Sequence, residues 1–143
     1  MCIYTMPRSD WDEQNPDKQA ILTLILKHQK EVERLHKLKQ YYVGQHDILG
    51  ENRKNKLVCN HAKDISDTAS SYFIGNPISY NSDEDISLLM DAFEQAGADE
   101  ADGDNGLDLS IYGCAYEYIY PMEDSTALSV KNLSPENTFM VYD

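Results

Sequence analysis

The chain has 143 residues, 41% of them hydrophobic and 10% aromatic, which predicts one folded domain and argues against intrinsic disorder. Its formal net charge is −13, with most of the Lys and Arg before residue 64 and most of the Asp and Glu from Asp64 onward. An acidic second half of this kind argues against binding to a phosphate backbone through clustered basic residues.

Targeting and redox signals are weak along the sequence. Cys2, Cys59 and Cys114 lie far apart and have no metal-ligand spacing, so reduced thiols in a cytoplasm are the simplest interpretation. The longest apolar run, residues 21–26, is far shorter than a membrane span requires. The first residues also lack the pattern of a signal peptide. No membrane partner is therefore expected.

The first predicted element is a long helix. Residues 1–14 show no periodicity and are expected to form a mobile arm. Asn15 is then a candidate N-cap, Pro16 a candidate first helical residue, and Asp17 suits the first turn. No Pro or Gly occurs from Asp17 to about Val43, so the sequence predicts one continuous helix there.

The apolar residues of this helix form two patches separated by the polar stretch 27–31. The gap indicates that the helix either crosses solvent or docks its two ends on different bodies. A helix that joins neighbouring bodies suits an assembly better than a small monomer. The patches are Ile21, Leu22 and Ile25, then Val32, Leu35, Leu38 and Tyr42.

A second helix is predicted with its own packed seam. Residues at 4, 3, 4, 3 spacing are expected to be buried along it: Val58, Ala62, Ile65, Ala69 and Tyr72. Gly44 and Gly75 each follow an aromatic pair and are expected to end the two helices in the left-handed conformation. Pro77 then prevents the second helix from continuing.

A third helix is expected to begin near Ser82, as N-cap of a capping box with Asp85, and to run to about Ala96. Its buried side is predicted to carry Ile86, Leu89, Phe93 and Ala96. Gly103 and Gly106 weaken the following acidic stretch, so its first half is expected to be loop. Residues 107–112 are expected to be helical and to end at Gly113.

The last part of the chain alternates with the period of strands. Tyr116, Tyr118 and Tyr120 share one face of a first strand, and Leu128, Val130 and Asn132 alternate along a second. A turn at 134–137 leads to a third strand in 138–142. The predicted fold is α+β, with helices over 15–113 and an antiparallel three-stranded sheet over 114–143. Because the sequence stops inside a strand, it is expected to be a fragment of a longer protein.

The sequence offers little sign of catalysis. The acidic run Asp99–Asp108 suggests a cation site, but its glycines do not fit the EF-hand register, so a solvated loop is favoured. His28, His36 and His61 have no partner at metal-ligand spacing. Phosphate-binding and nucleophile motifs are absent from the sequence. We expect no enzyme activity, cofactor or metal; a metal-dependent hydrolase using Asp99–Asp108 ranks last among the hypotheses.

Several stretches together resemble one known family. LKQYYVGQHDIL, KLVCNHAKDISDTASSYFIGNPISY, IYGCAYEYIY and LSPENTFMVYD are similar, in order and spacing, to the amino-terminal part of tailed-bacteriophage portal proteins, of the siphovirus and prophage type of Gram-positive hosts. The residues that carry this resemblance as a structural motif are Tyr41, Tyr42, Gly44, Asn60, His61, Lys63, Tyr72, Phe73, Gly75, Asn76, Pro77, Gly113 and Pro135.

The resemblance implies a structural subunit, the beginning of a portal wing region. Portal proteins form a ring, typically dodecameric, at one capsid vertex, and double-stranded DNA passes through its channel during packaging and ejection. Terminase, capsid or scaffold proteins and head-completion proteins are the implied partners. Assembly in the cytoplasm of the bacterial host and a final place in the virion are implied as well.

A competing hypothesis rests on charge alone. The acidic second half would suit a stand-alone adaptor or DNA-mimic module that binds a basic partner. The tyrosine face of the first strand could also stack nucleic-acid bases, although only Lys131 lies near it in sequence. Core or subunit packing is the favoured role for these tyrosines.

Overall fold

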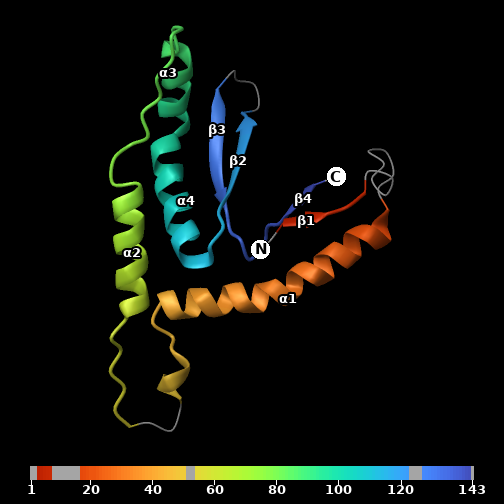
Figure 1. Ribbon diagram of the computed structural model, residues 1–143, viewed down its shortest axis with the longest axis vertical. Coiled ribbons are helices and arrows are strands. Elements are labelled where there is room, and N and C mark those ends of the chain that lie inside the picture. Colours follow the sequence, from red (N-terminus) through yellow and green to blue (C-terminus); the bar gives the residue numbers. More distant parts are fainter. Residues whose placement is uncertain (1–2, 8–16, 51–53, 123–126, 143) are drawn as a thin grey trace.

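The computed structural model describes residues 3–7, 17–50, 54–122 and 127–142. Figure 1 shows α1 crossing the molecule, with α2, the α3–α4 pair and a β-hairpin on one side of it and the segment that directly follows α1 on the other. The α+β class and the long first helix are confirmed. The elements are β1 (Ile3–Thr5), α1 (Lys18–Tyr42), the 3₁₀ turn η2 (Asp47–Leu49), α2 (His61–Phe73), α3 (Ser87–Ala96), α4 (Ala98–Tyr112), β2 (Tyr116–Pro121), β3 (Leu128–Leu133) and β4 (Met140–Tyr142).

Helix α1 begins at Lys18, later than the Asn15–Pro16 prediction, which falls outside the described residues. Asp17 is the N-cap, and its side chain accepts a hydrogen bond from the Gln19 backbone N–H at 2.9 Å. The predicted polar gap 27–31 is not left in solvent, because His28 is buried against Phe139 and Tyr4. One face of α1 therefore packs along its length, and the buried residues on it are Leu24, His28 and Leu35.

Helix α2 ends before Gly75 as expected, but it begins at His61 and so excludes Val58, which the prediction placed on its buried face. Ile65 is 69% exposed and Tyr72 is 94% exposed, so the predicted seam is wrong within this chain. The side that packs on α4 is made of small polar residues instead: Ser110 Oγ donates a hydrogen bond to the Ser66 carbonyl at 3.2 Å. The α2 stripe (Val58, Ala62, Ile65, Ala69 and Tyr72) thus lies largely on the surface.

The acidic stretch after Gly97 is helical, which corrects the predicted loop. Gly97 has φ +69° and joins α3 directly to α4, which runs without interruption to Tyr112. Gly106 is buried where Ile74 comes close: an added Cβ would overlap Ile74 Cδ1 and would lie 3.0 Å from Ile74 Cγ1. Close packing of two segments thus outweighs the low helix propensity of Gly106.

The start of α3 also differs from the prediction. The helix begins at Ser87, and its N-cap, Ile86, makes no side-chain capping bond. Ser82 Oγ accepts a hydrogen bond from the Glu84 N–H at 3.1 Å, and Asp85 Oδ1 accepts one from the Ser87 N–H at 3.0 Å. Both residues hold short local turns before the helix, so the predicted capping box does not form.

The strands form two separate two-stranded sheets. β2 and β3 make the predicted antiparallel hairpin, with Tyr118 opposite Lys131. β4 does not join it; it pairs in parallel with β1, with Tyr4 opposite Val141. The three-stranded antiparallel sheet is therefore wrong, and the described part of the expected arm is a paired strand. Residues distant in sequence supply the partner, which no local pattern indicates.

The core lies where α1, α4 and the start of the hairpin meet. Leu35 is fully buried there with Tyr112 and Tyr116, and burial raises the pKa of Tyr112 to about 12. The surrounding, partly buried residues are Leu38, Ile111, Cys114, Leu133 and Phe139. Of the predicted tyrosine face, only Tyr116 is in this core; Tyr118 is 56% exposed and stacks on Tyr120.

Candidate functional site

The motif residues of α1 and α2 meet in one junction. The Asn60 side-chain amide donates to the Tyr42 carbonyl at 2.7 Å, while its Oδ1 accepts from the Lys63 N–H at 3.2 Å. Asn60 thus caps α2 and ties it to the last turn of α1 with a single side chain. Gly44 lies buried beneath, with φ +82°, and an added Cβ would lie 3.2 Å from Val58 Cγ1. We call these residues, with Asp67, the α1–α2 junction.

Charge completes the junction. The Tyr42 hydroxyl donates to Asp67 Oδ1 at 2.8 Å, and Lys63 Nζ forms an ion pair with Asp67 and lies 4.9 Å from the centroid of the Tyr42 ring. The hydrogen bonds from Lys63 and Tyr42 lower the pKa of Asp67 below its usual range. The same carboxylate and hydroxyl raise the pKa of Lys63. These groups are solvent-accessible, and their contacts fix the end of α1 relative to the start of α2. Such an arrangement suits a rigid joint between the two helices.

A second joint links α1 to the turn before β4. Glu136 Oε1 is hydrogen-bonded to His36 Nδ1 at 3.0 Å, and its Oε2 accepts from Lys39 Nζ at 3.3 Å. Its backbone carbonyl is hydrogen-bonded to Nε2 of the buried His28 at 3.2 Å. Burial acts to raise the pKa of Glu136, but the His36 and Lys39 contacts outweigh it and the net shift is downward. Pro135, from the predicted motif, is fully buried in this turn.

The remaining motif residues do not join either network. Tyr72 and Phe73 end α2 at the surface, with exposed fractions of 94% and 72%. Gly75 does not have the predicted left-handed conformation. Glycine suits this position for another reason, because an added Cβ would overlap the Ser71 carbonyl oxygen. His61, Asn76 and Pro77 are exposed. Gly113 has φ +75° and ends α4 as predicted.

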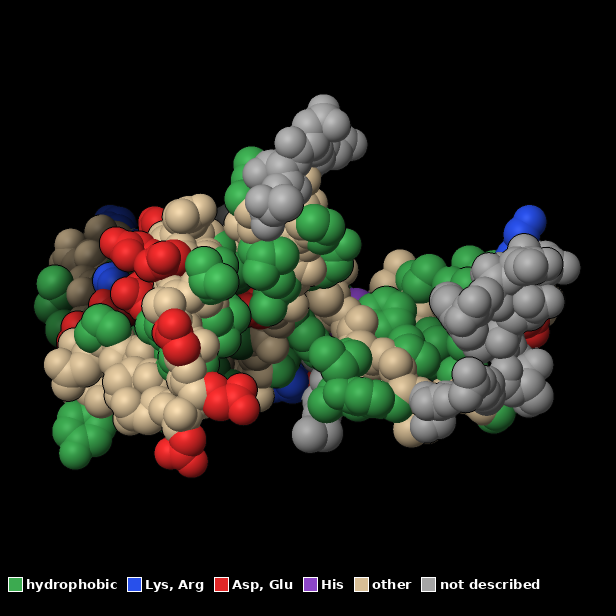
Figure 2. Space-filling model, turned by 90° about the horizontal axis from the view of Figure 1, so that it is seen from above, with side chains coloured by type: hydrophobic (Ala, Val, Ile, Leu, Met, Phe, Trp, Pro, Cys, Tyr) green, Lys and Arg blue, Asp and Glu red, His purple; other side chains and the backbone are tan. Residues whose placement is uncertain are grey.

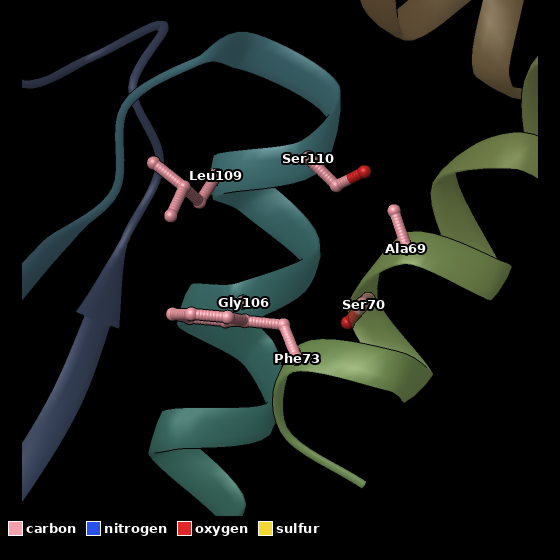
Figure 3. Close-up of a pocket in the computed structure, with 6 residues that line it drawn as sticks. All are labelled: Ala69, Ser70, Phe73, Gly106, Leu109 and Ser110. Atoms are coloured by element: carbon pink, nitrogen blue, oxygen red, sulfur yellow. The ribbon is translucent and has the colours of Figure 1, made fainter.

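An open groove separates the end of α2 from α4. It has a volume of about 170 Å³, and Figure 3 shows Phe73 reaching from α2 across α4 at Gly106. Ser70 and Ser110 supply the polar atoms of an otherwise apolar lining. We call this feature the α2–α4 groove, lined by Ala69, Ser70, Phe73, Gly106, Leu109 and Ser110.

The acidic stretch is spread around helix α4 and is not gathered into a cation site. Asn105 links it to the hairpin, donating to Glu117 Oε2 at 2.8 Å and accepting from Asn132 Nδ2 at 2.8 Å. Burial raises the pKa of Asp108. Among the described residues no group of three His, Cys, Asp or Glu side chains could hold a metal ion. Figure 2 shows carboxylate side chains gathered on the side of the molecule formed by α3 and α4.

The sequence analysis missed three residues that organise these sites. Asp67 could have been found, because it lies four residues after Lys63 on the same helix. Glu136 had no such signal, since its partners lie about a hundred residues earlier in the chain. Gly106 was counted as a weakness of α4, although it makes room for Ile74.

Comparison with known families identifies the chain. The family described as phage portal protein, SPP1 Gp6-like, matches residues 22–143, which include α1 from its second turn onward and both joints. The chain belongs to the phage portal protein family. No curated protein matches it. Portal proteins form an oligomeric ring at the capsid vertex through which DNA passes, so this portal chain has a structural role in the virion.

One further observation concerns membranes. Within residues 3–7, 17–50, 54–122 and 127–142, no helix of this portal chain is both long and apolar enough to span a bilayer. Leu22, Ile25 and Leu26 of α1 are among its exposed apolar residues. They lie beside lysines on the same helix.

Proposed function

We propose that this chain forms the amino-terminal part of the wing of a portal subunit, and that the subunit assembles head-to-tail into a ring around the DNA channel. The family match over residues 22–143 carries this proposal. The two joints support it, because they fix α1, α2 and the β4 turn in one frame. A rigid arrangement of elements held by hydrogen bonds and ion pairs suits a structural part of a subunit that has no catalytic role.

The finer attributes of this proposal come from the resemblance of the motifs. They are a dodecameric ring, a siphovirus or prophage of a Gram-positive host, assembly in the host cytoplasm, and docking of terminase, capsid or scaffold proteins and head-completion proteins. No catalytic role is proposed for any residue. The acidic α4 is proposed to keep the wall from holding DNA tightly, since like charges repel.

Negative-stain electron microscopy of the complete portal subunit tests the proposal. We expect rings with a central hole, and mass photometry of the same sample should give a mass near twelve subunits. Particles that stay monomeric or dimeric under all assembly conditions would contradict the proposal. They would favour the acidic adaptor, whose basic partner could then be sought by binding assays.

A further inference from the structure

The α2–α4 groove lies beside several exposed apolar side chains. Phe73, on its rim, is 72% exposed, and Tyr72 and Ile65 beside it are exposed to 94% and 69%. Large apolar side chains gathered in this way mark a binding surface more often than an ordinary surface. At about 170 Å³ the groove is smaller than typical pockets for small-molecule ligands, so protein side chains fit it better.

A ring places two conditions on such a surface. Subunits in a cyclic ring meet through two different patches, so the surface that covers the groove must lie elsewhere on the same chain. It should also lie toward the opposite side of the subunit. Figure 1 shows α2 at one lateral edge of the molecule, while the first half of α1 extends to the other edge.

The first half of α1 carries a matching patch. Leu22 and Leu26 are 57% and 60% exposed and lie one helical turn apart. Lys18 precedes them by one turn and Lys30 follows by one turn, and both are exposed. We call these four residues the α1 edge. Its order is basic, apolar, apolar, basic along one line of the helix.

The charges of the two surfaces are complementary. Helix α4 carries no Lys or Arg, and Asp102 and Asp99 lie one and two turns before Gly106 on the groove side of the helix. The basic residues of α1, by contrast, outnumber its two glutamates: Lys18, Lys27, Lys30, Arg34, Lys37 and Lys39. Oppositely charged surfaces raise the association rate and fix the register of a contact.

We propose that, in the ring, the α2–α4 groove of one subunit receives Leu22 and Leu26 from the α1 edge of the next subunit. The flanking lysine nearer the start of α4, Lys18 or Lys30, then faces the carboxylates of Asp99 and Asp102, which lie one turn apart on one side of Gly106. This inference rests on the proposed ring function and names the surfaces that build it. It accounts for the exposure of Ala69, Tyr72 and Phe73 at the groove, because a neighbouring copy covers these residues in the assembly.

Disulfide cross-linking in the complete portal subunit, with its native cysteines replaced by serine, tests the contact. Leu26→Cys combined with Ala69→Cys in each subunit should give a ladder of covalently linked oligomers after oxidation of assembled rings. The matched control combines Leu26→Cys with Gln95→Cys, an exposed position on α3, and should give no ladder. Rings without a ladder from the first pair, or with equal ladders from both pairs, would overturn the inference and leave the proposed function intact.

Charge reversal gives an independent test that does not depend on cross-linking geometry. Lys18→Glu with Lys30→Glu should weaken ring association about tenfold, and Asp99→Lys with Asp102→Lys should do the same. The four changes together should restore much of the association, because the pairing is re-formed with opposite signs. Circular dichroism would verify that each variant is folded. Full ring formation in both double variants, or loss without rescue in the fourfold variant, would contradict the inference. A wild-type subunit that forms no ring would overturn the proposed function as well.

Discussion

The ends of α1 and α2 share a sequence pattern but differ in the burial and contacts of its residues. Each has an aromatic pair, one further residue and a glycine: Tyr41-Tyr42-Val43-Gly44 and Tyr72-Phe73-Ile74-Gly75. At the end of α1 the glycine is buried at φ +82° and Tyr42 enters a network with Asn60, Lys63 and Asp67. At the end of α2 both aromatic side chains are exposed, and a Cβ added at Gly75 would overlap the Ser71 carbonyl oxygen.

The comparison teaches that the pattern determines only that a helix stops. What the aromatic residues do depends on whether another segment is close enough to accept their hydrogen bonds. Asp67 of α2 accepts the hydrogen bond of the Tyr42 hydroxyl, whereas no described residue does so for Tyr72, which remains 94% exposed. The end of α1 is packed against other segments of the same subunit. The end of α2 is, by our inference, covered by the next subunit.

The largest expected effect is at the glycine of the α1–α2 junction. Gly44→Ala should lower the free energy of unfolding by about 2 kcal/mol, because the left-handed conformation and the contacts with Val58 and Asn60 both penalise a Cβ. Gly97→Ala is the matched control: its φ is also positive but its surroundings are open, so a loss of only about 1 kcal/mol is expected. Urea denaturation measures both. Equal losses would show that crowding plays no part at Gly44.

The amide that links the two helices should come next. Asn60→Ala removes the N-cap of α2 and the partner of the Tyr42 carbonyl, and should cost about 1.5 kcal/mol of stability. Asn76→Ala, after the end of α2, should change stability by less than about 0.5 kcal/mol because its side chain is exposed. If the two variants unfold at the same urea concentration, the joint does not stabilise the fold.

The end of α2 packs against α4 at Gly106. We therefore expect alanine substitutions at two glycines of α4 to change the stability of the protein in opposite directions. Gly106→Ala should destabilise by about 1 kcal/mol, since crowding against Ile74 outweighs the gain in helix propensity. Gly103→Ala, with nothing within 4 Å of an added Cβ, should stabilise by about 0.5–1 kcal/mol. Thermal melts of both variants give the comparison. A stabilised Gly106→Ala protein would show that α2 and α4 pack less closely than we describe.

The smallest effect concerns a single hydroxyl at the α1–α2 junction. Tyr42→Phe should raise the pKa of Asp67 toward its usual value while Lys63 still holds it down, which NMR titration of the carboxylate can follow. Because the folded-state pKa is depressed, this contribution to stability is present at neutral pH and is lost as the pH falls through the pKa of Asp67. The difference in Tm between wild type and variant should therefore shrink in acid. Tyr72→Phe should show no such difference at any pH.

Much of the fold followed from local chemistry. The uninterrupted stretch to Tyr42 gave the long helix, Gly113 marked the end of α4, and period-two alternation gave the β2–β3 hairpin. These features depend on groups a few residues apart, whose steric and hydrogen-bonding preferences are readable in the sequence. The ordered motifs also led to the portal family, which the family match confirms.

Tertiary structure alone decided which faces are buried and which strands pair. The stripe containing Ile65 has the periodicity of a seam, yet α4 packs on the neighbouring polar side, so a charge introduced at Ile65 would lie at the surface of this chain. β4 pairs with β1 across almost the whole sequence, and Glu136 reaches His36 and Lys39 of α1. The physical reason is that periodicity shows which residues can share a face, whereas burial depends on the partner that covers it. For the exposed residues beside the α2–α4 groove of this portal protein, that partner is, by our inference, a second copy of the chain.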